Sequence, residues 1–287
     1  MVSKTGLIAA PTRRQILAAS GAAAVTATTS MKARAQAKIA PPNIIKPGTL
    51  VMSTNPTLRP LQWVNDKGEL QGMRVELGNE IAKSLGLTPE YVRIEFSAQV
   101  PGLAAKRWDM INTGIFYTEE RSKLMYMVPY ERGALSFIVA RGNPLGIKDV
   151  KDLAGRRVSV ELGGIEERRT RELSQTLQGQ SLKALDIRTF NNFAEAFQAL
   201  RAGQVDASVT IDATALALQE TGDFTRAITG LFPQIVCIAF ANKTLAEAVV
   251  GSLNDLKKSG FYDALFTKYG VLTSEGATFG IMGSGPA

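Results

Sequence analysis

The segment from Asp109 to Tyr130 combines residue types that can bind an anion. It begins as an apolar strand containing Gly114, and Thr118 then takes the place of a helix N-cap before two acidic residues. Arg121 occupies the third helical position, where the capping-box pattern favours Glu or Gln. A guanidinium beside the free N–H groups of a helix N-terminus can bind a carboxylate. The alternative is a solvated surface arginine that follows two acids.

A second charged residue stands at the end of another expected strand. Ser208 to Ile211 is predicted to be this strand, and Asp212 follows it directly. In open α/β sheets, ligands gather at the carboxyl ends of the strands, which favours a ligand-binding role for Asp212. Asp212 can equally cap the helix expected from Ala213 to Gln219. The two roles are compatible.

The elements that must position these residues are expected strands and amphipathic helices. Helices are predicted at Glu76 to Leu85 and at Ala194 to Ala202, and a strand at Tyr91 to Phe96. A helix that ends in a turn, followed by an Asp and an apolar strand, occurs at Asp109 and again at Asp206. Two lobes built on one plan would produce this repeat, as would chance. The length of 287 residues allows one large domain or two lobes.

The first 37 residues have the pattern of an export signal. Arg13-Arg14 form a twin-arginine pair, an Ala-rich run follows from Ile16 to Thr29, and Ala35-Gln36-Ala37 is a small-x-small cleavage site. We expect the mature protein to begin near Lys38, with a Pro-rich tether at residues 38–47, and to lie in the periplasm. The alternative is a disordered basic N-terminus.

Charge and composition exclude several classes of function. The formal charge of +7 falls to +2 when the five cations of the export signal are removed, which does not argue for nucleic acid or an anionic membrane. The chain has no histidine, which excludes His-based triads and His metal ligands, and it has no CxxC, zincin or Walker pattern. We therefore expect no metal, no cofactor and no nucleic-acid partner. Cys237, the single cysteine, lies in an apolar strand and is expected to be buried and free.

Several motifs together resemble the family 3 bacterial extracellular solute-binding proteins, the periplasmic amino-acid receptors of ABC importers. The spacing from Asp109 to Arg121 matches that family, and three further segments resemble its motifs: Asp149 to Val160, Gly203 to Ala207 and Gly260 to Gly270. The resemblance extends from Gly48 to Gly270. It implies a two-lobed periplasmic-binding-protein fold of type II, in which each lobe is a mainly parallel sheet flanked by helices and two crossings form the hinge.

The same resemblance implies how the chain is divided and what it does. Lobe 1 is expected at residues 43–141 plus 239–272, lobe 2 at residues 142–238, and a flexible Gly/Ser-rich tail at residues 273–287. A ligand between the lobes selects the closed state. Arg121 is expected to clamp the α-carboxylate of an amino acid from lobe 1, and Asp212 to hold its ammonium group from lobe 2. The expected partner is the membrane permease of an ABC importer, and the receptor is expected to be a monomer.

The resemblance also suggests residues that complete the carboxylate cradle. Backbone groups of Thr113, Gly114 and Phe116 are expected to contribute from lobe 1. The backbone amides of Gly164 and Ile165 are expected to contribute from lobe 2.

The expected side-chain pocket departs from the family. Asn55 stands where many members have Asp, Leu58 stands where they often have Tyr, and Phe96 is expected to line one wall. Phe116 and Ile165 replace small hydroxyl residues. These substitutions predict a pocket more apolar than a lysine or glutamate receptor would need, although each residue could simply belong to the core.

Two alternatives keep the fold and change the function. Cyclohexadienyl dehydratases resemble these receptors, and Glu166, Glu167 or Glu76 could supply the general acid that such chemistry requires. A receptor for a carboxylate other than an amino acid would keep Arg121 and leave Asp212 unused.

Overall fold

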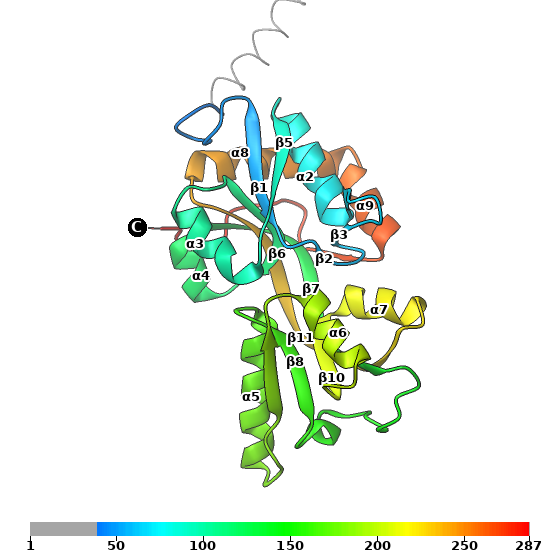
Figure 1. Cartoon of the computed structure of the whole chain (residues 1–287). Helices are drawn as coiled ribbons and strands as arrows, with labels where there is room; N and C mark the ends of the chain where they lie inside the picture. Colours follow the sequence, from blue (N-terminus) through cyan, green and yellow to red (C-terminus); the bar gives the residue numbers. More distant parts are fainter. Residues whose placement is uncertain (1–38, 287) are drawn as a thin grey trace, which may run out of the picture.

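The computed structural model describes residues 39–286, which form two lobes joined by two long strands (Figure 1). The export signal predicted for residues 1–37 lies outside the described residues. Lobe 1 contains segments from both ends of the described chain, and lobe 2 contains its central part. The predicted two-lobed mixed α/β fold is confirmed.

The elements of lobe 1 are β1 (Thr49–Thr54), β2 (Thr57–Leu58), β3 (Gln62–Val64), β4 (Leu70–Gln71), α2 (Met73–Ser84), β5 (Thr88–Arg93), a 3-10 turn (Phe96–Ala98), α3 (Gln99–Ala104), β6 (Met110–Phe116), α4 (Glu119–Leu124), α8 (Lys243–Lys258), α9 (Phe261–Tyr269) and β12 (Leu272–Thr273). Those of lobe 2 are a 3-10 turn (Val150–Leu153), β8 (Arg157–Glu161), α5 (Ile165–Gly179), β9 (Asp186–Phe190), α6 (Phe193–Arg201), β10 (Ala207–Ile211) and α7 (Asp212–Glu220). The long strands β7 (Tyr126–Ala140) and β11 (Phe224–Phe240) run through both lobes. No helix in the described part of the chain is long and apolar enough to cross a membrane.

Each lobe has parallel strands at its centre. β1 pairs in parallel with β5 and β6, and β8 pairs in parallel with β9 and β10. Every residue of β1, β6 and β10 is buried, as expected for parallel strands covered by helices on both faces. In lobe 2, α5 lies on one side of these strands and α6 on the other (Figure 1). The carboxyl ends of β1, β6, β8 and β10 meet between the lobes.

The repeat suggested by Asp109 and Asp206 is present in the structure. The Asp109 carboxylate accepts a hydrogen bond from the backbone N–H of Val51 in β1 at 2.9 Å, and the Asp109 N–H donates to the Val51 carbonyl at 2.8 Å. Asp206 makes the same pair of bonds with Arg157 in β8, each at 2.8 Å. In both lobes a buried or half-buried Asp therefore joins the start of one strand to its neighbour.

The two crossings lie within β7 and β11. The first half of β7 pairs with β11 beside β6 in lobe 1, and its second half, from Leu135 to Val139, pairs with β10 in lobe 2. The β7–β11 register shifts between Ile228 and Leu231 and again between Leu231 and Gln234. Each crossing is therefore a continuous strand and not a loop, and the lobe boundaries expected at residues 141 and 239 stay a prediction.

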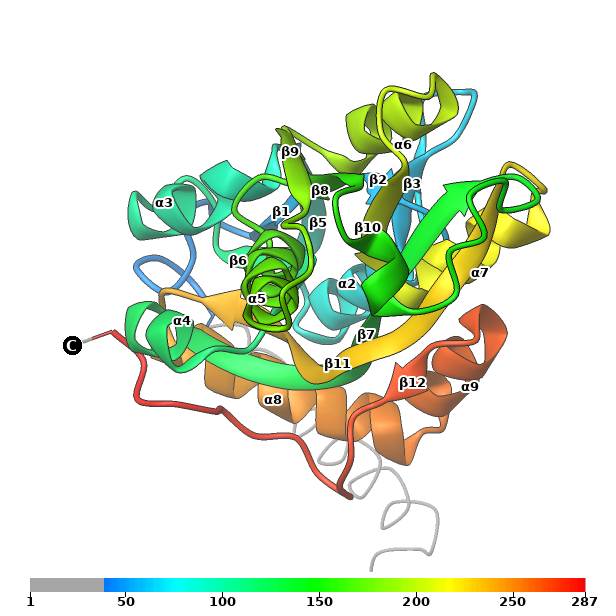
Figure 2. The same cartoon turned by 90° about the horizontal axis from the view of Figure 1, so that it is seen from below.

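Both ends of the described chain pack against lobe 1. Ile39 and Ile44, in the segment predicted to be a tether, are buried in its core. Of the tail expected to be flexible at residues 273–287, the part from 274 to 286 lies along α8 and ends beside α4 (Figure 2). The Met282 N–H donates to the Met127 carbonyl at 2.7 Å, and the Gly285 N–H donates to the Ser122 carbonyl at 2.9 Å. Phe279 and Ile281 also pack against the core of lobe 1, and the ring of Phe279 lies 5.1 Å from that of Tyr262, so apolar contacts and backbone hydrogen bonds together hold this Gly-rich segment.

Cys237 is buried in β11 with a free thiol, as predicted. Burial raises the pKa of this thiol, so the nucleophilic thiolate form is disfavoured at neutral pH. Cys237 therefore belongs to the core of lobe 1.

Candidate functional site

A small cavity lies between the lobes, where the carboxyl ends of the central strands meet. Six residues of lobe 1 and five of lobe 2 line it: Asn55, Leu58, Phe96, Thr113, Gly114, Phe116, Glu161, Ile165, Glu166, Phe193 and Ile211. It leaves about 10 Å³ for the centre of a water molecule, which corresponds to a single water. Any larger ligand therefore requires the two walls to move apart.

The structure brings seven of the ten predicted site residues to this cavity. They are Asn55, Leu58, Phe96, Thr113, Gly114, Phe116 and Ile165. Arg121 and Gly164 line an adjoining pocket at the mouth of the cleft, which shares Ile165 with the cavity. Asp212 lies on neither wall, and only its neighbour Ile211 reaches the cavity.

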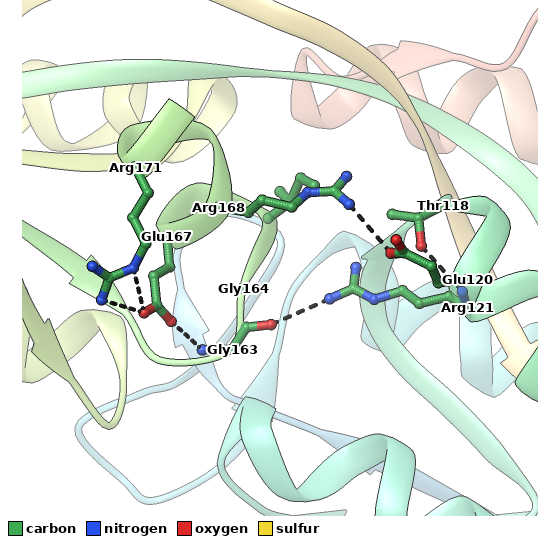
Figure 3. Close-up of a pocket in the computed structure, with 9 residues that line it drawn as sticks. Thr118, Glu120, Arg121, Gly163, Gly164, Glu167, Arg168 and Arg171 are labelled. Carbon is green, nitrogen blue, oxygen red and sulfur yellow. Dashed lines mark hydrogen bonds and ion pairs between the residues drawn. The ribbon is translucent and has the colours of Figure 1, made fainter. Parts of the chain in front are cut away.

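Arg121 bridges the two lobes at the mouth of the cleft (Figure 3). Thr118 caps α4, as predicted, and its hydroxyl accepts from the Arg121 N–H at 3.1 Å. The guanidinium donates to the Phe116 carbonyl at 3.0 Å and across the cleft to the Gly163 carbonyl at 3.3 Å. It also lies over the ring of Phe96, 5.4 Å from the ring centroid. The backbone and the ring thus fix the direction of the guanidinium.

The other arginines of this mouth pocket are already paired with acids. Arg168 lies 3.4 Å from the carboxylate of Glu120, and Arg171 lies 2.8 Å from that of Glu167 (Figure 3). Arg121 contacts carbonyl oxygens and has no carboxylate within ion-pair distance among the described residues. Burial lowers the pKa of Arg121, and the nearby Glu166 acts in the opposite direction. Of the three, Arg121 is therefore the one whose charge is best placed to meet a ligand carboxylate.

Asp212 is engaged within lobe 2. Its carboxylate lies 2.8 Å from a guanidinium nitrogen of Arg226 and accepts from the hydroxyl of Ser136. Asp212 is the first residue of α7, whose N-cap is Ile211, and its side chain makes no capping hydrogen bond. The carboxylate is thus paired with β11 and does not line the cavity. The assignment of Asp212 to a ligand ammonium group stays a prediction.

Two acidic residues reach the cavity that were not among the predicted ligand contacts. Glu161 ends β8 with 2% of its surface exposed, and the side-chain amide of Asn55 donates to it across the cleft at 2.6 Å. Glu166, in the first turn of α5, is 4% exposed. Burial raises the pKa of both carboxyls, and Glu166 and Glu95 raise that of Glu161 further. The signal that would have identified Glu161 is its place at the end of a strand, the same signal that indicated Asp212.

The cavity combines apolar and acidic residues. Leu58, Phe96, Phe116 and Ile165 line it, and they share it with two buried carboxyl groups. That the pocket is more apolar than a lysine or glutamate receptor would need stays a prediction.

A buried ion pair supports the strand that forms the floor of the cavity. The Arg74 guanidinium lies 2.8 Å from the carboxylate of Glu131, and the exposed fractions of the two side chains are 0% and 1%. Arg74 also donates to the Thr113 carbonyl in β6 and, at 3.1 Å, to the side chain of Gln62. Gly114 has a φ of 76°, and a Cβ there would lie 2.0 Å from the Arg74 guanidinium carbon. Only glycine allows β6 to approach the ion pair this closely.

Gly114→Ala should destabilise the fold by roughly 1–3 kcal/mol, the usual cost of a strained backbone conformation. The added methyl group would also displace the Arg74 guanidinium, and the cavity floor would move with it. Urea denaturation followed by circular dichroism measures the loss. Gly251→Ala in α8 is the matched control, because its Cβ meets nothing within 4 Å. Equal stability of the two variants would contradict this role for Gly114.

The chain is similar in sequence and in structure to proteins of one known family. The family model for bacterial extracellular solute-binding proteins, family 3, matches residues 50–271. The L-cystine-binding protein TcyJ of Escherichia coli (strain K12) is 29% identical over 227 residues, which is 77% of this chain and 82% of TcyJ.

Solved structures show the same fold. An ancestral arginine-binding protein bound to glutamine is 31% identical with a TM-score of 0.69, and the match covers 78% of this chain and 99% of that one. An ancestral amino acid-binding protein, a precursor of cyclohexadienyl dehydratase, is 28% identical with a TM-score of 0.67 and coverage of 77% and 95%. All three relatives are named as binding proteins and not as enzymes. The predicted type II periplasmic-binding-protein fold is confirmed, and because the family model spans most of the chain, this protein belongs to the bacterial extracellular solute-binding proteins of family 3.

Proposed function

We propose that this protein is the amino-acid receptor of an ABC importer and captures its ligand between two closing lobes. The observation that carries the proposal is Arg121, whose guanidinium is fixed at the cleft mouth by carbonyls of both lobes and which forms no ion pair with a carboxylate of residues 39–286. Relatives that bind cystine, arginine and glutamine support the ligand class. The dehydratase alternative is less well supported, since the relatives are binding proteins.

Closure follows from the position of Arg121. A guanidinium has five N–H donors, so a ligand carboxylate can be bound by those that do not contact Phe116 and Gly163. The Gly163 N–H donates to Glu167, so lobe 2 contributes the backbone N–H groups of Gly164 and Ile165 at the start of α5, a position that favours an anion. A ligand that contacts both walls stabilises the closed form, which is the form we expect the membrane permease to receive.

A thermal-shift screen with the twenty standard amino acids, L-cystine and their α-keto analogues tests the proposal. We expect at least one amino acid to raise the melting temperature, and calorimetry to confirm one site per chain. A turnover assay with prephenate and arogenate should give no product. Failure of every amino acid to bind, or turnover of either compound, would overturn the receptor function.

We also propose that the chain reaches the periplasm by the twin-arginine route, as Arg13-Arg14 and Ala35-Gln36-Ala37 indicate. N-terminal sequencing of the secreted protein should give a start near Lys38. Replacing both arginines with lysine should retain the precursor in the cytoplasm, whereas replacing Lys4 with arginine should not. A periplasmic product from the lysine variant would show that another route is used.

A further inference from the structure

The interlobe cavity is lined by two acidic residues, Glu161 and Glu166, to which the proposed function assigns no role. Glu161 and Glu166 come from the two ends of one turn of lobe 2, since one ends β8 and the other begins α5. Both line the cavity opposite the lobe 1 residues Thr113 and Phe116. Arg121 stands at the adjoining mouth pocket. The cleft therefore has a cation at its entrance and two carboxyl groups within.

Glu166 is the less satisfied of the two acids. It is 4% exposed, and within residues 39–286 its carboxylate makes no hydrogen bond with another residue and no ion pair. Its one hydrogen bond is with its own backbone N–H. Glu161 accepts from Asn55, so one of its oxygens is fixed by the opposite lobe. A buried carboxyl group without partners is costly unless a donor or a cation comes to it.

Asp212, the other candidate for a ligand cation, is in a different position. Its charge is balanced by Arg226 at 2.8 Å, and it lies outside the cavity. An ammonium group that reached Asp212 would have to compete with a guanidinium already in place. Glu161 and Glu166 form no ion pair with any described residue, because Arg121 donates to carbonyls.

We propose that Glu161 and Glu166 together bind the ammonium group of the ligand, and that Asp212 does not. This inference rests on the proposed amino-acid receptor function and narrows its ligand class. A zwitterion would place its carboxylate at Arg121 and its ammonium group between the two glutamates. A ligand with an acidic side chain would bring a third carboxylate into this buried site. Neutral and basic amino acids should therefore bind, and aspartate and glutamate should not.

The same arrangement predicts that binding releases protons. Burial raises the pKa of Glu161 and of Glu166, and the charged groups that face them are Glu95, Arg121 and Arg74. An arriving ammonium group stabilises the carboxylate forms and lowers both pKa values. Protons held in the free protein are then lost on binding. Affinity should rise as pH increases through the raised pKa values and become constant above them.

Isosteric variants test the assignment. Glu161→Gln, Glu166→Gln and Asp212→Asn are titrated by calorimetry with the tightest amino acid from the screen and with its α-keto analogue. Each glutamate variant should lose about tenfold or more in affinity for the amino acid, the effect of losing a charged hydrogen bond, and little for the keto analogue. Asp212→Asn should bind like the wild type. Glu172→Gln, on the same helix as Glu166, is the control, because it removes one charge and the ion pairs with Arg168 and Arg169 at a residue that does not line the cavity.

The outcomes separate this inference from the receptor function. If the wild type binds no amino acid, the receptor function fails. If the wild type binds one and only Asp212→Asn weakens it selectively, the receptor function stands and the role of the glutamates is wrong. Titrations of the wild type in buffers of different ionisation enthalpy, between about pH 5 and pH 8, should show proton release near the raised pKa values. Release that is absent, or that persists unchanged in the double glutamine variant, also overturns the inference.

Discussion

Arg121→Ala should lower the affinity for the bound amino acid by about 10²- to 10³-fold. The change leaves the ligand carboxylate without its charged partner in a cleft that excludes water, and breaking a buried charge pair costs roughly 3–5 kcal/mol. The fold should persist, because Arg121 stands at the cleft mouth and supports no core. Calorimetric titration of the purified variant measures the loss, and its melting temperature checks the fold.

Two variants make the Arg121 prediction specific. Arg121→Lys should recover only part of the affinity, since an ammonium point charge cannot reproduce the two-pronged contact of a guanidinium with a carboxylate. Arg168→Ala removes an arginine of the same mouth pocket that is paired with Glu120, and it should change affinity little. If Arg121→Ala binds like the wild type, the carboxylate is held elsewhere.

Glu131→Leu should cost about 3–5 kcal/mol of folding stability, because it leaves the Arg74 guanidinium charged and unpaired in the core of lobe 1. That is a large share of the roughly 5–15 kcal/mol by which a domain is stable. Urea denaturation should show a much lower midpoint. Ligand affinity should fall as well, since Arg74 fixes the Thr113 carbonyl on the cavity floor.

The double variant Arg74→Met/Glu131→Leu should regain most of this stability, because an apolar pair of similar volume can replace a buried ion pair. Arg157→Met is the matched control in lobe 2. Its ion pair with Asp206 is partly exposed, with 38% and 16% of the side chains accessible, and its loss should cost at most about 1 kcal/mol. A double variant as unstable as Glu131→Leu alone would mean that the hydrogen bonds of Arg74, and not its charge, support β6.

The parts of this protein that could be predicted from sequence depend on neighbours along the chain. The Thr118 cap and Arg121 belong to one turn of helix, so their arrangement follows from local spacing. The sequence around Pro129 does not indicate a strand, because proline usually interrupts one. β7 nevertheless runs through Pro129, next to a shift in its register with β11, where proline is tolerated.

The rest of the site depends on contacts between distant segments. Asp212 forms an ion pair with Arg226 of β11, and no sequence pattern around Asp212 indicates that partner. Glu161 and Glu166 each lie two residues from the Gly163–Gly164 turn, yet their burial depends on how lobe 2 faces lobe 1. The Arg74–Glu131 pair joins residues 57 positions apart in the sequence. Tertiary packing determines which of these distant residues contact each other, and the local sequence pattern around each residue does not predict it.

The placement of residues 274–286 determines where a fusion partner would emerge. Because the chain is held at Ser122 and passes the ring of Tyr126, a fluorescent protein joined at the C-terminus would begin beside α4 and would move with lobe 1. A second fluorophore near Gly179, at the far end of α5, would move with lobe 2 (Figure 1). The tail thus provides a fixed attachment point for an optical sensor of this ligand, one that needs no engineered rigid linker on the lobe 1 side.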